Sequence, residues 1–104
     1  MLLFHGTNAE NLPDMLSCGV NADSYWGTFE QAREFAQVFS DGIILQADID
    51  VDDLQASLLM AESLYENGDI DEIPDASDVD YSLDNLGGCV CLVTITDFTV
   101  VEQD

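Results

Sequence analysis

The sequence has almost no positive charge. Arg33 is the only residue of the lysine and arginine type, and 22 acidic residues give a formal net charge of −21. Such a surface repels phosphates, which argues against a nucleic acid or an anionic membrane as the direct partner. One side-chain cation cannot neutralise these carboxylates through ion pairs. The acids therefore form either a generic solubilising surface or a surface that binds a basic macromolecule.

Long apolar runs and a secretory leader are also missing. No run approaches the ~20 residues that span a bilayer. The apolar start, residues 1–4, lacks a basic stretch and ends at His5. We therefore expect a soluble, cytoplasmic protein of the host cell cytosol. With 104 residues, 47% of them hydrophobic, residues 1–104 are expected to form a single domain with its own core.

Cysteine is scarce, and its number is odd. Cys89 and Cys91 are i, i+2 neighbours whose side chains a strand would point to one face, and Cys18 lies far from them in the sequence. We expect buried reduced thiols and no disulfide framework. A zinc site would require His5 and all three thiols to converge from three distant segments, so none is predicted.

The spacing of some acidic residues is similar to that of a calcium loop. Asp48, Asp50 and Asp52 match the first three ligand positions of an EF-hand. The match then ends, because Asp53 occupies the position of the loop glycine and Leu59 that of the final glutamate. The sequence therefore predicts no metal site.

The hydrophobic periodicity predicts an α+β domain. Residues 28–31 form a capping-box pattern before a helical repeat, and residues 43–49 alternate as in a half-buried strand. Residues 68–88 are expected to be an acidic loop or a short helix. The order of elements indicates a small mixed sheet with about three helices. The expected elements are strand 2–4, a turn at 5–7, helix 12–18 between Asn11 and Gly19, helix 29–39, strand 43–49, a helix from Asp52 or Asp53 to 67, and strands 89–95 and 98–101, joined by a hairpin or a tight corner.

Four segments carry a resemblance to a known family. Residues 3–7 read Leu-Phe-His-Gly-Thr, and residues 25–36 read Tyr-Trp-Gly-Thr-Phe-Glu-Gln-Ala-Arg-Glu-Phe-Ala. With residues 11–20 between them, they resemble the N-terminal half of ADP-ribosyltransferase domains, where a strand ends in His-Gly-Thr and an aromatic-x-Thr element opens an Ala-rich helix. Residues 84–92 are similar to a segment of phage-encoded anti-CRISPR ADP-ribosyltransferases. The resemblance implies an ADP-ribosyltransferase-like fold.

The resemblance also implies roles for individual residues. His5 would bond a ribose hydroxyl of NAD, and Trp26, with Tyr25 beside it, would take the place of the tyrosine that stacks on the nicotinamide. Asp84 would stabilise the cationic sugar as nicotinamide leaves, and Arg33 is the only side-chain cation for the pyrophosphate. The implied catalytic residues are His5, Trp26 and Asp84, and the implied NAD-binding residues are His5, Gly6, Thr7, Tyr25, Trp26 and Arg33.

Two functions follow from these observations. The favoured one is an acidic DNA mimic, encoded by a phage or mobile element, that binds the basic nucleic-acid-binding surface of a host defence protein in an anti-CRISPR or anti-restriction role. Such a mimic needs no cofactor. The alternative is an NAD-dependent mono-ADP-ribosyltransferase that modifies such a host protein. The expected partner-binding residues are Asp48, Asp50, Asp52, Asp53, Glu62, Glu66, Asp69, Asp71, Glu72, Asp75, Asp78 and Asp80.

Overall fold

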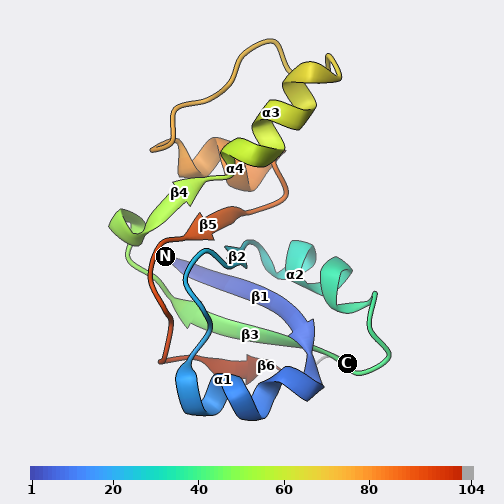
Figure 1. Cartoon of the computed structure of the whole chain (residues 1–104), viewed down its shortest axis with the longest axis vertical. Helices are drawn as coiled ribbons and strands as arrows, with labels where there is room; N and C mark the ends of the chain where they lie inside the picture. The colour runs from blue at the N-terminus through green and yellow to red at the C-terminus, as the bar shows by residue number, and fades with distance from the viewer. Residues whose placement is uncertain (102–104) are drawn as a thin grey trace.

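A computed structural model describes residues 1–101 and arranges them as two three-stranded antiparallel sheets with four α-helices (Figure 1). The α+β class is confirmed, whereas the single mixed sheet and the three helices were wrong. The first sheet has the order β1 (Leu2–Asn8), β3 (Gly42–Asp48), β6 (Thr99–Val101), and the second has the order β2 (Tyr25–Trp26), β5 (Cys89–Cys91), β4 (Leu54–Ala56). The helices are α1 (Leu12–Cys18), α2 (Phe29–Ala36), α3 (Leu58–Glu66) and α4 (Val79–Asn85), with 3-10 turns η1 (Ala9–Asn11) and η2 (Val51–Asp53).

The first strand is longer than predicted. β1 pairs with β3 along its whole length, with His5 opposite Leu45 and Thr7 opposite Ile43. The predicted turn at 5–7 was therefore wrong, because this segment finds its hydrogen bonds in the sheet. Gly6 lies directly against α2, where an added Cβ would come within 2.2 Å of the Ala32 carbonyl oxygen. The absence of a side chain allows the helix to approach the strand.

Both faces of β3 are covered. Ile44 is 0% exposed and packs with Ala32 and Ala36 of α2, whereas Leu45 belongs to the main core on the other face. The main core also contains Met15 of α1 together with residues of the second sheet. The prediction of a half-buried strand was wrong because α2 buries the second face.

The capping box that predicted α2 is confirmed. The Thr28 hydroxyl accepts from the Gln31 amide, and the Gln31 side chain accepts from the Thr28 amide. The helix ends at Ala36 instead of 39, because the amides of Val38 and Phe39 bond the carbonyls three residues earlier. This i to i−3 pattern tightens the chain and stops the α-helix.

The predicted helix from 52 or 53 to 67 was wrong at its start. Leu54 pairs with Cys91 and Ala56 with Cys89, so residues 54–56 form β4, and α3 begins only at Leu58. The apolar spacing that indicated a helix at Leu54 instead reflects burial in the second sheet. The predicted end of this helix is confirmed.

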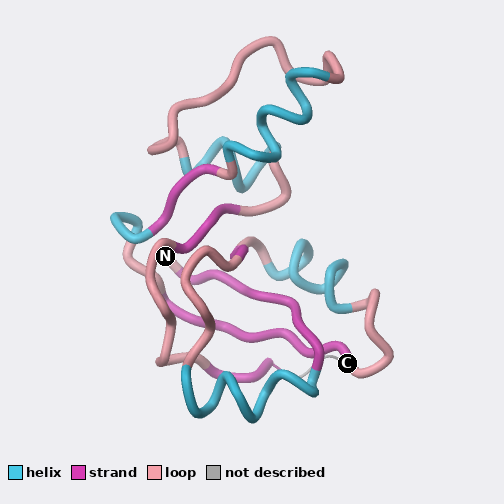
Figure 2. Tube along the Cα trace, in the orientation of Figure 1, coloured by secondary structure: helices cyan, strands magenta, loops and turns pink. Residues whose placement is uncertain are grey.

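The last two strands do not form a hairpin. β5 pairs with β2 and β4, whereas β6 pairs with β3 in the other sheet (Figure 2). Residues 92–98 connect the two strands, so the tight corner at residues 96–97 was also wrong. β5 ends at Cys91, and β2 was not predicted because two residues are too short to show a period. α4 confirms the short-helix alternative for residues 68–88. Within the described residues, no helix is both long and apolar enough to cross a membrane.

Candidate functional site

A largely apolar cleft lies where β1, β2 and α2 meet the segments around α3 and α4. Its volume is about 520 Å³, within the size range of small-molecule sites. Four aromatic side chains line it together with an imidazole, a thioether and a leucine. These are Phe4, Tyr25, Trp26, Phe35, His5, Met60 and Leu86.

His5 is held by the backbone of the neighbouring strand. Its Nδ1 lies 2.6 Å from the carbonyl oxygen of Tyr25, and a carbonyl can only accept, so we assign the proton to Nδ1. Nε2 then carries the lone pair. Burial lowers the pKa of His5, and the hydrogen bond to Tyr25 raises the pKa by less. The imidazole is therefore neutral at neutral pH and presents an acceptor.

The two aromatic residues of β2 differ in exposure. Trp26 is 1% exposed, and its ring centroid lies 5.2 Å from that of His5, with 36° between the ring planes. The Trp26 indole donates to the Ser24 hydroxyl at 2.9 Å. Tyr25 is 46% exposed, and its hydroxyl lies 3.0 Å from the Ser57 hydroxyl. Trp26 is thus a core ring that also lines the cleft, and Tyr25 is the more accessible ring.

Buried serines hold the wall of the cleft on the α4 side. The Ser82 hydroxyl accepts from the Ser57 amide at 3.0 Å and donates to the Gly88 carbonyl at 2.5 Å. Both serines are buried, and Ser57 also bonds Tyr25. This network connects β2, the start of α3, α4 and the start of β5. Sequence reasoning missed it, because serine is usually exposed and no spacing marks a buried serine.

Gln31 connects α2 to α4. Its side-chain amide donates to the Leu83 carbonyl at 2.6 Å, while its oxygen caps α2. The sequence identified Gln31 only as a capping residue. Its long-range bond fixes the distance between the two walls of the cleft.

The structure brings together four of the residues that the family resemblance singled out. His5, Gly6, Tyr25 and Trp26 all line the cleft. The cleft lining contains no carboxylate, because Asp84 lies exposed on α4 outside it. A transferase of the expected type therefore lacks its acid in this conformation.

Thr7 and Arg33 also lie outside the cleft. Thr7 lines a second cavity of about 360 Å³ together with Cys18 and His5, and its hydroxyl accepts from the Asn11 side chain at 3.3 Å. Arg33 is exposed on α2 and lines neither cavity. The structure thus offers no cation in the cleft for a pyrophosphate.

The thiols and the acidic spacings form no metal centre among residues 1–101, where no three suitable side chains come together. All three cysteines are free. Cys89 and Cys91 are buried, but Cys18 is exposed, which corrects the expectation that all three are buried. Burial, with a smaller effect of the neighbouring Cys91, raises the pKa of Cys89 to about 11, so this thiol stays protonated.

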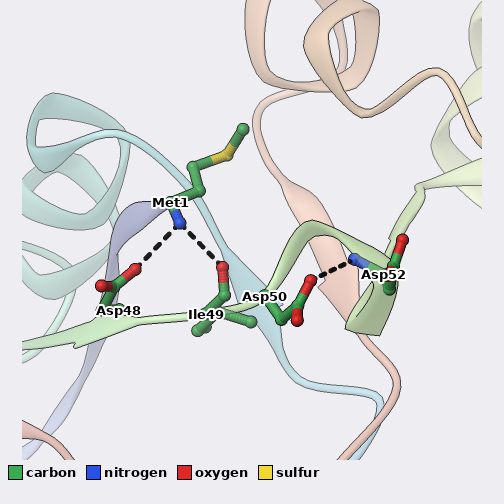
Figure 3. A network of polar contacts seen from close by, with 5 residues as sticks. All are labelled: Met1, Asp48, Ile49, Asp50 and Asp52. Atoms are coloured by element: carbon green, nitrogen blue, oxygen red, sulfur yellow. Dashed lines mark hydrogen bonds and ion pairs between the residues drawn. The ribbon is translucent and has the colours of Figure 1, made fainter.

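The carboxylates are exposed and almost unpaired. In the described part of the chain, every acidic side chain is exposed except that of Asp53, which is partly buried. The one ion pair there joins the amino group of Met1 to Asp48 at 2.9 Å (Figure 3). The Met1 amine also donates to the Ile49 carbonyl, and Asp50 accepts from the Asp52 amide. The negative charge is therefore available to a partner.

The expected partner-binding acids lie in two groups. Asp48 is the last residue of β3, and Asp50, Asp52 and Asp53 follow it. The other eight lie on α3, on the connection after it and on α4 (Figure 1). Comparisons with known proteins add no family, because no family model, no curated protein and no solved structure matches the chain.

Proposed function

We propose that this chain is an acidic DNA mimic that binds the basic nucleic-acid-binding surface of another protein. The observation that carries the proposal is the exposure of nearly all described carboxylates, with a single ion pair among residues 1–101. Unpaired charges of one sign repel each other and destabilise a fold, unless a partner of opposite charge compensates them. A basic groove that normally holds nucleic acid is such a partner.

The dimensions support this proposal. The longest dimension of the protein is 40 Å, and a net charge of −21 over that length gives about one charge per 2 Å. Duplex DNA carries one charge per about 1.7 Å of its axis. A groove that accommodates about ten base pairs would thus meet a similar charge over a similar length.

The identity of the partner class rests on the family resemblance. Residues 84–92 are similar to a segment of phage-encoded anti-CRISPR ADP-ribosyltransferases, which supports an inhibitor that a phage or mobile element directs at a CRISPR or restriction complex of the host cytosol. The mechanism is competition with the nucleic acid, and it requires neither NAD nor a metal. Steering by the field would raise association rates by about 10 to 10³ at low salt.

Competition against DNA tests this function. Purified CRISPR effector and restriction complexes are incubated with a labelled DNA duplex, and release of the DNA is measured as the protein is added. We expect release from at least one complex, with an affinity that falls by at least about tenfold between 50 and 500 mM salt. Failure to displace DNA from any of them, or an affinity independent of salt, would contradict the proposal.

Matched charge variants locate the surface. One variant changes Asp69, Asp71, Glu72 and Asp75 to the corresponding amides, and the control changes Glu10, Asp14, Asp23 and Asp97 in the same way. Both remove four negative charges from exposed positions. We expect the first variant to lose at least about tenfold more affinity than the control. Equal losses would show that the expected partner-binding acids have no special role.

The cleft favours a second candidate function, NAD-dependent mono-ADP-ribosylation. His5, Gly6, Tyr25 and Trp26 line it together, as the resemblance implies for a nicotinamide site. The absence of a carboxylate in its lining makes this function the weaker candidate. Incubation with labelled NAD and the same complexes decides between them. Label transfer that is lost in both His5→Ala and Asp84→Ala would establish the transferase, and inhibition without label would exclude it.

A further inference from the structure

The cleft exposes apolar surface on a strongly acidic protein. Phe35 is 57% exposed, Tyr25 46% and Met60 43%, and all three line the cleft. These groups come from α2, β2 and α3, so the patch exists only in the folded state. Apolar side chains grouped at a concave surface mark binding sites.

Carboxylates lie close in sequence to three walls of this cleft. Glu34 precedes Phe35 on α2, and Glu62 follows Met60 by two residues on α3. Asp84 of α4 precedes Leu86, which follows the helix, by two residues. All three acids are exposed. Residues one or two positions apart on a helix point to different sides, so these carboxylates act through the field of the whole protein, whose net charge is −21. That field attracts an occupant with a cationic end and repels an anionic occupant.

The cleft also offers a hydrogen-bond acceptor and no competing cation. His5 lines both this cleft and the cavity beside Thr7. Its Nδ1 proton is bonded to the Tyr25 carbonyl, and the lone pair of its Nε2 has no partner within residues 1–101. Arg33, the single arginine of the chain, is not part of the lining. An occupant that only donates hydrogen bonds complements this wall.

We propose that the cleft receives an arginine side chain of the basic partner. A guanidinium is planar, only donates, and stacks on aromatic faces, while its aliphatic stem packs on apolar surface. A lysine ammonium is compact and strongly hydrated, so it gains less from Phe35 and Tyr25. The inference rests on the proposed function, because it names one contact of the same basic partner.

Two peptides test the arginine site. One is a capped heptalysine, and the other has arginine at its central position; binding of each to the intact protein is measured by fluorescence anisotropy in 150 mM salt. We expect the arginine peptide to bind about three- to thirty-fold more tightly, the range that stacking on an aromatic face supplies. Equal affinities with normal salt dependence would overturn the arginine site and leave the DNA-mimic proposal standing. Binding of neither peptide would contradict the DNA-mimic proposal itself.

Variants of Phe35 separate stacking from simple apolar contact. Phe35→Leu keeps an apolar side chain and removes the aromatic face, whereas Phe35→Tyr keeps the face. Val38→Ala changes a residue that is exposed near the end of α2 and does not line the cleft. We expect the preference for arginine to fall at least threefold (~0.65 kcal/mol or more) in Phe35→Leu only. A preference that survives in Phe35→Leu would overturn the site.

A competition experiment tests whether the cleft binds a different occupant. Free nicotinamide, a neutral ring, is added at millimolar concentration to the arginine peptide complex. We expect no displacement. Displacement with equal affinities for the two peptides would assign the cleft to a neutral ring and overturn the arginine site.

Discussion

The sheet of β1, β3 and β6 and the acidic segment, residues 58–88, are stabilised in different ways. In the sheet, β3 is covered on both faces by apolar side chains, and Ile44 is fully buried beneath α2. The acidic segment carries nine of the 22 acidic residues and is held through buried serines, the Gln31 bond and a few apolar anchors such as Leu86. The comparison shows that a strongly charged segment can be positioned by satisfied polar contacts when apolar burial is limited.

The largest expected effect on the free energy of unfolding is in the sheet of β1, β3 and β6. Ile44→Ala deletes a fully buried side chain between the sheet and α2 and should reduce the free energy of unfolding by about 2–5 kcal/mol. Leu59→Ala, in the acidic segment, removes a side chain that is 78% exposed, and we expect a change within about 0.5 kcal/mol. Urea denaturation followed by circular dichroism measures both. Similar losses of unfolding free energy in the two variants would show that apolar burial does not distinguish the two regions.

The next effect concerns the polar contacts of the acidic segment. Ser82→Ala removes the acceptor of the Ser57 amide and the donor to the Gly88 carbonyl, both in buried surroundings. We expect a loss of about 1–3 kcal/mol, because both groups remain buried without a partner. Ser63→Ala, at an exposed position of α3, is the matched control and should be near neutral. A neutral Ser82→Ala would show that the serine network does not hold the segment.

The smallest effect is at His5, where the two regions meet. Burial lowers the pKa of His5 below 6.5 in the folded state, so the unfolded chain takes up a proton first as the pH falls. Stability should therefore decrease as the pH drops from 6.5 toward the folded-state pKa, and remain level above 6.5. The measurement is urea denaturation of the wild type and His5→Asn at pH 7.5, 6.5 and 5.5. Subtracting the two free energies of unfolding removes the contributions of the other titrating groups. A difference that stays constant over this pH range would contradict the lowered pKa of His5.

The candidate site was only partly predictable from the sequence. His5, Gly6, Tyr25 and Trp26 stand in short motifs, and the structure brings them to one cleft. Phe35 of α2, Met60 of α3 and Leu86, directly after α4, complete its walls, and no local pattern connects them. Asp84 was chosen because it precedes the late strand that begins at Cys89, but the cleft lining does not include it.

The sequence by itself determined the charge, the α+β class and the elements whose signals are local. The capping box at Thr28 and the stop of α1 at Gly19 act through neighbouring residues, so they hold in the fold. Only the tertiary structure decided that β5 lies between β2 and β4 and that residues 54–56 form a strand. Strand pairing depends on contacts between distant segments. A strand of three residues is too short to show an alternation of apolar and polar residues, so the sequence does not reveal it.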